Sequence, residues 1–109
     1  NWFRKGEDGK FVWPGYGDNM RVLKWMIDRL EGKAQGEDHA FGISPTYEEI
    51  NWEGLDFSRE QFASVTDMNA EDWKKELALH DEHFDKLAYH LPQELVATKA
   101  QMEARILGQ

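Results

Sequence analysis

Residues 1–25 read NWFRKGEDGKFVWPGYGDNMRVLKW, and this stretch decides how the chain starts to fold. The turn sequence Glu-Asp-Gly-Lys at 7–10 lies between two arms that are rich in aromatic residues. Such a turn between apolar arms predicts a β-hairpin within residues 1–17. Pro14 and Gly15 then end the second arm, because neither residue favours a continued strand.

The part of this stretch that follows the glycines predicts a helix over about 19–31. Asp18 or Asn19 is suited to the N-cap position, and Gly32 stands where a C-terminal glycine is common. The apolar residues recur at helical spacing, namely Val22, Leu23, Met26, Ile27 and Leu30.

The middle of the chain predicts little regular structure. Residues 32–40 are polar and indicate an exposed loop, and the apolar run that follows predicts one short strand near 40–45. Two capping-box patterns, in which Ser or Thr precedes Glu or Gln by three residues, each predict a short helix. These patterns are Thr46 with Glu49 and Ser58 with Gln61, and the second helix is expected over about 58–66.

The last forty or so residues predict two helices. Asn69 is a favourable N-cap for the first, which carries a heptad-like apolar stripe at steps of four and three residues. The stripe consists of Trp73, Leu77, His80, Phe84, Leu87 and Leu91. Pro92 breaks this helix and starts another over about 92–107, with Leu95, Met102 and Ile106 inward. The predicted fold class is therefore mainly α with a small β portion.

Composition excludes several classes of function. The chain has 109 residues and no Cys, which excludes disulfides, thiolate metal sites and a Cys nucleophile. No apolar run approaches the roughly 20 residues that span a bilayer, so we expect no membrane partner and a soluble, cytoplasmic protein. The net charge of −8 is uneven: residues 1–36 carry +2 and residues 37–109 carry −10. An acidic body repels a phosphate backbone, so we expect no nucleic-acid partner.

The N-terminal rings are the best candidates for a binding site. Phe3, Phe11 and Tyr16 lie near the two arms and the glycine turn, and exposed rings can stack on a planar base. Asn19 offers both a donor and an acceptor to the polar edge of such a base. The competing interpretation is that the apolar residues of the two arms only form the packing face of a hairpin, namely Trp2, Phe3, Phe11, Val12 and Trp13.

Two other interpretations concern the C-terminal half. Glu76, His80 and His83 have spacings of four and three, which resembles metal-ligand spacing on one helical face. A small metal-dependent hydrolase is one hypothesis on that basis. The other is a freestanding acidic helical module that binds a partner protein through the Trp73–Leu91 stripe.

The sequence NWFRKGEDGKFVWPGYGDNMRVLKWMIDRLEGKA at 1–34 closely resembles the C-terminal region of the GTP-dependent phosphoenolpyruvate carboxykinases, in particular the bacterial type. The family pattern reads Asn-Trp-Phe-Arg, then Phe-x-Trp-Pro-Gly-aromatic-Gly-x-Asn, then an Arg-Val-Leu-x-Trp helix. The run AFGISPTYEEINWEGL matches a weaker part of that pattern, and residues 58–109 match only in type. The resemblance implies a C-terminal fragment of an α/β nucleotide-binding domain. Its parts would be a guanine-binding segment and helix at 1–34, a linker with a short strand and short helices at 35–68, and two helices at 69–109.

The resemblance also implies roles for the candidate residues. In this family, aromatic side chains of this segment hold the guanine of GTP or GDP. By motif position they are Phe3, Phe11 and Tyr16, with Asn19 at the base's polar edge. Family members usually have Phe where Tyr16 stands, which is a mild departure because Tyr also stacks. Trp2 and Trp13 would support these rings from behind.

The family reaction converts oxaloacetate and GTP to phosphoenolpyruvate, carbon dioxide and GDP in gluconeogenesis. The family's phosphate loop, its Mn²⁺ or Mg²⁺ ligands and its mobile lid lie upstream of this segment. The resemblance therefore implies no catalytic and no metal-binding residue in this chain, and we expect the fragment alone to be inactive. The whole enzyme is expected to be monomeric, whereas the fragment, with apolar edges uncovered, is expected to self-associate.

Overall fold

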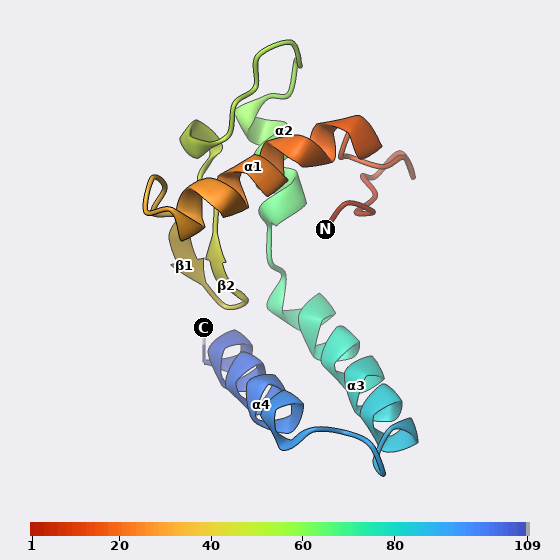
Figure 1. The fold of residues 1–109 in the computed structure, drawn as a ribbon. Helices are drawn as coiled ribbons and strands as arrows, with labels where there is room; N and C mark the ends of the chain where they lie inside the picture. The colour runs from red at the N-terminus through yellow and green to blue at the C-terminus, as the bar shows by residue number, and fades with distance from the viewer. Residues whose placement is uncertain (109) are drawn as a thin grey trace. The chain divides into compact units, whose positions relative to one another are not determined.

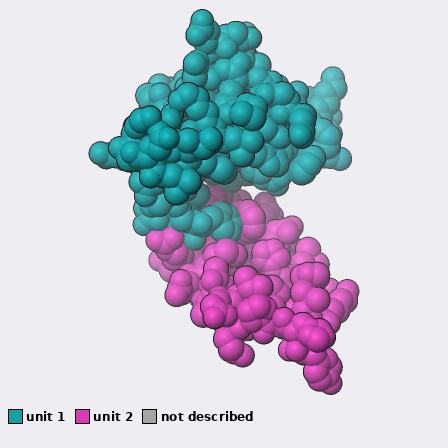
Figure 2. All heavy atoms as spheres, viewed as in Figure 1, with its two compact units in different colours: residues 1–67 teal, residues 68–109 magenta. Residues whose placement is uncertain are grey.

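The computed structural model describes residues 1–108 and shows two compact units, Asn1–Asp67 and Met68–Gln109 (Figure 2). The first unit contains two 3₁₀ turns, two helices and a two-stranded sheet, and the second contains two helices (Figure 1). In chain order the elements are η1 (Tyr16–Asp18), α1 (Asn19–Leu30), β1 (Glu37–His39), β2 (Gly42–Ser44), η2 (Tyr47–Glu49), α2 (Arg59–Thr66), α3 (Ala70–Lys86) and α4 (Gln93–Leu107). The prediction of a mainly α fold with a small β portion is confirmed. Within the described residues, no helix is long and apolar enough to cross a bilayer.

Helix α1 starts at Asn19 and ends at Leu30, close to the predicted range of 19–31. Gly32 has φ of +76°, and the N–H groups of Gly32 and Lys33 donate to carbonyls of the last helical turn at 3.1 and 2.7 Å, which closes the helix. Asp18 occupies the N-cap position, but its side chain caps nothing. Its carboxylate instead accepts from Arg21, and the side chain of Asn19 accepts from Trp13. The predicted N-cap position at Asp18 is therefore confirmed, although its side chain does not cap the helix.

The apolar side of α1 is only partly covered. Trp25 is the buried residue of this helix. Five apolar side chains of the helix remain exposed within this chain, namely Met20, Leu23, Met26, Ile27 and Leu30.

Residues 1–15 fold as a loop with a single antiparallel bridge between Lys5 and Phe11. The N–H of Gly6 donates to the Lys10 carbonyl, and the N–H of Val12 donates to the Arg4 carbonyl, both at 2.9 Å. The predicted reversal of the chain is present, but it does not extend into strands. In Figure 1 this loop lies beside the start of α1.

The β portion is the antiparallel hairpin of β1 and β2, in which Glu37 pairs with Ser44 and His39 with Gly42. Strand β2 lies within the predicted strand near 40–45. Strand β1 was not predicted, because residues 32–40 were expected to form an exposed loop; that expectation is wrong for Glu37–His39. A polar edge strand of three residues carries no apolar alternation that would reveal it.

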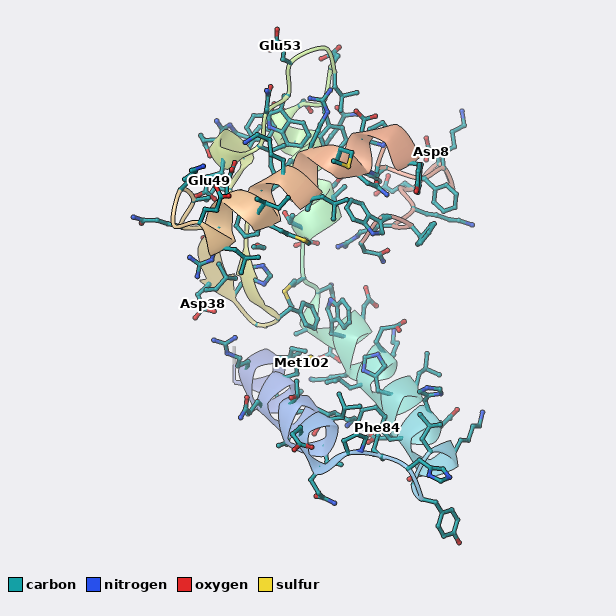
Figure 3. The ribbon with its side chains drawn as sticks, viewed as in Figure 1. Asp8, Asp38, Glu49, Glu53, Phe84 and Met102 are labelled. Atoms are coloured by element: carbon teal, nitrogen blue, oxygen red, sulfur yellow. The ribbon has the colours of Figure 1, made fainter. Side chains whose placement is uncertain are left out.

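Glu49 joins three segments of the first unit through one carboxylate (Figure 3). Its Oε1 accepts from the backbone N–H groups of Gln35 and Gly36, each at 2.9 Å. Its Oε2 accepts from the Trp25 indole and from the N–H of Thr46, each at 3.1 Å. The last of these bonds is the predicted Thr46–Glu49 capping contact. The backbone donors of Gly36 and Thr46 contribute most to lowering the pKa of Glu49 to about 2.

The second unit is an antiparallel pair of helices, α3 and α4, which contact each other (Figure 1). The predicted cap at Asn69 is confirmed, since its side chain accepts from the N–H groups of Glu71 and Asp72. Leu77, at the centre of the predicted stripe, is buried with 4% of its surface exposed, and Ile106 is buried on α4. The centre of the stripe is therefore core of this unit, whereas Leu87 near its end is exposed, and docking of a partner protein along the stripe stays a hypothesis.

One predicted inward position of α4 is wrong. Leu95 is exposed, whereas Lys99, a residue not expected inside, is buried. The Lys99 ammonium pairs with Asp81 of α3 at 2.7 Å and with Glu103 one turn further along α4. Its aliphatic stem thus covers apolar surface while its charge is neutralised by two carboxylates.

Replacement of Gly36 by Ala tests the close approach at this residue. Gly36 has φ of +73°, and an added Cβ would lie 2.5 Å from Ile43 Cγ2, 2.8 Å from the Ser44 carbonyl and 2.9 Å from Trp25 Cζ2. We expect G36A to lower the free energy of unfolding by about 2–4 kcal/mol, from overpacking added to left-handed strain. Urea titration with tryptophan fluorescence measures this. The control is G32A, which has the same φ region with no atom within 4 Å of the added Cβ and should lose only about 1 kcal/mol. Equal losses in the two variants would contradict the close-packing argument.

The Glu49 carboxylate predicts a pH dependence of stability. Because its pKa is lowered from 4.5 to about 2 in the folded state, its contribution is fully present above pH 4.5 and is lost as the pH falls towards 2. We expect E49Q to be less stable than the parent chain at pH 6 and to lose less stability between pH 4.5 and 2. Denaturant titrations across that range measure both quantities. The control is E53Q, because Glu53 lies at the tip of the loop before α2 (Figure 3) and its carboxylate accepts none of the hydrogen bonds that Glu49 accepts. A profile of E49Q that parallels the parent chain would refute the assignment.

Candidate functional site

The site is built on an aromatic cluster, which we define as Trp13, Tyr47, Trp52, Phe57 and Phe62. Trp52 stacks on Tyr47 and Phe57 with ring centroids 5.1 and 5.2 Å apart, and Phe62 meets Trp52 edge-on at 5.8 Å. The Trp52 indole donates to the Tyr47 carbonyl at 2.8 Å, and the Tyr47 hydroxyl donates to the Phe57 carbonyl at 2.6 Å. The polar edges of these rings are thus satisfied inside the first unit, so the cluster is a fixed platform.

Trp13 connects the N-terminal loop to this cluster. It is 6% exposed and meets Phe57 and Trp52 edge-on at 5.5 and 6.2 Å. Trp2 packs on its other side at 5.7 Å. These contacts join the two indoles to each other and to the cluster, and the expectation that they pack behind Phe3, Phe11 and Tyr16 stays a prediction.

Phe3 and Phe11 behave differently, although they come from the same segment. They remain 70% and 56% exposed. Their rings contact each other edge-to-face with centroids 6.0 Å apart, because the Lys5–Phe11 bridge brings the two arms together. The Lys5 ammonium lies 5.5 Å from the Phe11 centroid, which places a positive charge beside the exposed pair. The hairpin packing-face interpretation therefore fits Trp2 and Trp13 but not these two rings.

Tyr16 is carried by the η1 turn and is 91% exposed. Gly15, just before it, has φ of +149°, a conformation that residues with a Cβ rarely adopt, so glycine sets the direction in which the turn leaves the loop. Across residues 1–108, the Tyr16 ring contacts no other aromatic ring. The structure thus brings Phe3 and Phe11 together and leaves the third predicted ring free of both.

Asn19 is tied to the core and to Tyr16 at once. Its backbone N–H donates to the Tyr16 carbonyl and closes the η1 turn. Its side-chain Oδ1 accepts from the buried indole Nε1–H of Trp13 at 2.7 Å. In the part of the chain that the structure describes, its side-chain nitrogen has no acceptor. Sequence reasoning expected Asn19 to offer a donor and an acceptor; the oxygen is directed at the Trp13 indole, and the amide nitrogen is the uncommitted end.

Arg21 holds this region from the other side, and sequence reasoning missed it. Its Nε donates to the Asp18 carboxylate at 2.9 Å, and its two terminal nitrogens donate to the carbonyls of Asn51 and Glu53 at 2.6 and 2.9 Å. The guanidinium thus joins the η1 turn to the loop before α2. The only sequence signal was the Asp18–Arg21 spacing of three residues.

The described residues do not fit a metal site. No three His, Asp or Glu side chains of residues 1–108 are grouped so that they could hold an ion. Glu76, His80 and His83 therefore do not form the ligand set that the hydrolase hypothesis requires. We therefore assign no metal-ligand role to these three side chains.

Comparison with known proteins agrees with the sequence resemblance. The family model described as the phosphoenolpyruvate carboxykinase C-terminal P-loop domain matches residues 1–105. A phosphoenolpyruvate carboxykinase [GTP] from Anaeromyxobacter dehalogenans strain 2CP-1 is 42% identical over 106 residues, which are 97% of this chain and 18% of the relative. The enzymes of the same name from Corynebacterium jeikeium and Renibacterium salmoninarum are 42% and 40% identical over 87% and 97% of this chain.

These relatives are much longer than the present sequence, since the chain spans 16–18% of their length. The match covers nearly all of the chain at 40% identity or more, including the segment that carries the exposed rings. The chain therefore belongs to the GTP-dependent phosphoenolpyruvate carboxykinase family, as part of its C-terminal P-loop domain.

Proposed function

We propose that this chain supplies the guanine-base site of a GTP-dependent phosphoenolpyruvate carboxykinase. The observation that carries the proposal is the exposure of Phe3, Phe11 and Tyr16 beside a core that buries other rings of the same unit. Exposed rings on a fixed platform are poor for stability but suited to stacking on a planar base. The relatives are named for their use of GTP, which supports guanine as that base.

The proposed division of labour follows from the residues present. Phe3, Phe11 and Tyr16 hold the faces of the base, and Asn19 meets its polar edge. Base stacking contributes about 1–3 kcal/mol per ring–base contact. Two or three such contacts correspond to a dissociation constant near the millimolar range. The chain alone therefore binds and orients the base weakly, and groups outside it must hold the phosphates.

The whole enzyme is proposed to convert oxaloacetate and GTP to phosphoenolpyruvate, carbon dioxide and GDP in gluconeogenesis. Mn²⁺ or Mg²⁺ would neutralise charge on the transferred phosphoryl group, and none of the residues described above fits that ion. The contribution of this chain is positional. By fixing the base, it fixes the far end of the nucleotide and so limits where the γ-phosphoryl group can lie.

Truncation of the exposed rings tests the proposal in the complete carboxykinase that carries this segment. We expect F3A and Y16A each to raise the KM for GTP by about 5- to 100-fold, the equivalent of 1–3 kcal/mol of lost stacking, with a much smaller change in kcat. Steady-state kinetics with varied GTP and saturating oxaloacetate measure this.

The matched control is F41A, because Phe41 is a partly exposed ring of the same unit in the β1–β2 turn. Its loss should leave the KM for GTP within about twofold of the parent enzyme, since no base contact is removed. The proposal is wrong if F3A and Y16A both leave the KM for GTP at the control value.

A further inference from the structure

We infer that Trp13 sets the base preference of this site by fixing the Asn19 amide, so that only N–H donors face the ligand and a purine with an oxygen at position 6 is selected. The inference rests on the proposed function and adds a positioning residue to it. Trp13 itself touches no base in this scheme. It acts through Asn19, which it contacts at 2.7 Å.

The orientation of the amide follows from the chemistry of its partner. An indole N–H can only donate a hydrogen bond, so the amide atom that faces it must be the oxygen. The reverse orientation would place two donors 2.7 Å apart and leave the buried indole N–H without an acceptor. Trp13 therefore determines which end of the Asn19 amide points into the core.

The indole is itself held in place. Trp13 is 6% exposed and is packed by Phe57, Trp52 and Trp2. Rotation of such a ring requires the surrounding rings to move, because side chains in a close-packed core interdigitate. The backbone of Asn19 is also fixed, through its N–H bond to the Tyr16 carbonyl. The Asn19 side chain is thus constrained at both ends, and its two N–H donors keep one direction.

A donor-only edge discriminates between purines. Asn commonly reads adenine by accepting from the 6-amino group with its oxygen while donating to N7 with its nitrogen. That reading needs Oδ1 directed at the base, and here Oδ1 is directed at the Trp13 indole. Guanine offers acceptors at O6 and N7, so the free Nδ2 group can donate to it. A 6-amino group in the place of O6 is itself a donor. It would face the Nδ2 donor of Asn19, and both groups would be left without an acceptor.

The direct test compares two nucleotides that differ at the 6-position edge. In the complete carboxykinase, we expect W13F to lower the ratio of kcat/KM for GTP to that for 2,6-diaminopurine riboside triphosphate by about tenfold, the value of one good polar contact to a base. W13F keeps an aromatic ring in the core and removes the N–H donor, so the Asn19 amide is free to turn. N19A should lower the same ratio at least as much.

The matched control is W2F, which removes an indole beside Trp13 that does not bond to Asn19. It should keep the parent ratio. Any loss of folded enzyme in W13F reduces the rates with both nucleotides equally, so the ratio separates a positioning role from a structural one. In the chain itself, the W13F substitution should also shift the Asn19 side-chain amide resonances in ¹⁵N-resolved spectra.

The outcomes separate this inference from the proposed function. A lowered ratio in W13F with an unchanged ratio in W2F supports the inference. An unchanged ratio in W13F, in an enzyme whose KM for GTP rises in F3A, overturns the inference and leaves the guanine site standing. No effect of F3A and Y16A on the KM for GTP overturns both.

Discussion

The hydrogen bond from the Trp13 indole to Asn19 is the contact on which the candidate site depends. It joins a ring buried in the aromatic cluster to a polar side chain in the first turn of α1. The indole N–H needs a buried acceptor, and the amide oxygen needs a fixed donor. This one contact thus gives the buried indole N–H its acceptor and fixes the orientation of the Asn19 amide. Because α1 begins at Asn19, the same contact also sets where this helix starts relative to the N-terminal loop.

Glu49 has the corresponding role at the other end of α1. Its carboxylate accepts from Trp25, from the loop before β1 and from Thr46, and so links three segments of the unit. The first unit is therefore held by two polar links at opposite ends of one helix, with aromatic packing between its N-terminal loop and the loop before α2. A core of this kind is more specific than a purely aliphatic one, since each buried polar group accepts few alternative partners.

Sequence signals that act between nearby residues predicted the helices well. Contacts between residues far apart in the sequence could not be predicted. Capping boxes act within a few residues, and α1, α2 and α4 lie close to their predicted ranges. Helix α3 instead ends at Lys86, before the break that was expected at Pro92. Strand β1 was missed because its three polar residues are held by pairing with β2.

The candidate site was also predicted only in part. The sequence showed its residue types, and the family resemblance implied their roles. The sequence did not show which rings are exposed. Phe3 and Trp13 are equally suited to a core by residue type, and only the packing of Trp13 on Trp52 distinguishes them. The commitment of the Asn19 oxygen to Trp13 was hidden because packing decides it.

The orientation of the candidate site residues and the affinity for a nucleotide have different origins. The contacts that orient the site residues, from Trp13, Arg21 and the Lys5–Phe11 bridge, all lie within Asn1–Asp67. Orientation is thus a property of this unit, whereas stacking on two or three rings yields only a few kcal/mol. A nucleotide that is held tightly must gain the rest of its binding energy from phosphate contacts, which an acidic chain with a net charge of −8 is poorly suited to provide. Under the proposed function, the base site would therefore act chiefly to select the nucleotide, and the strength of binding would be set by groups outside this chain.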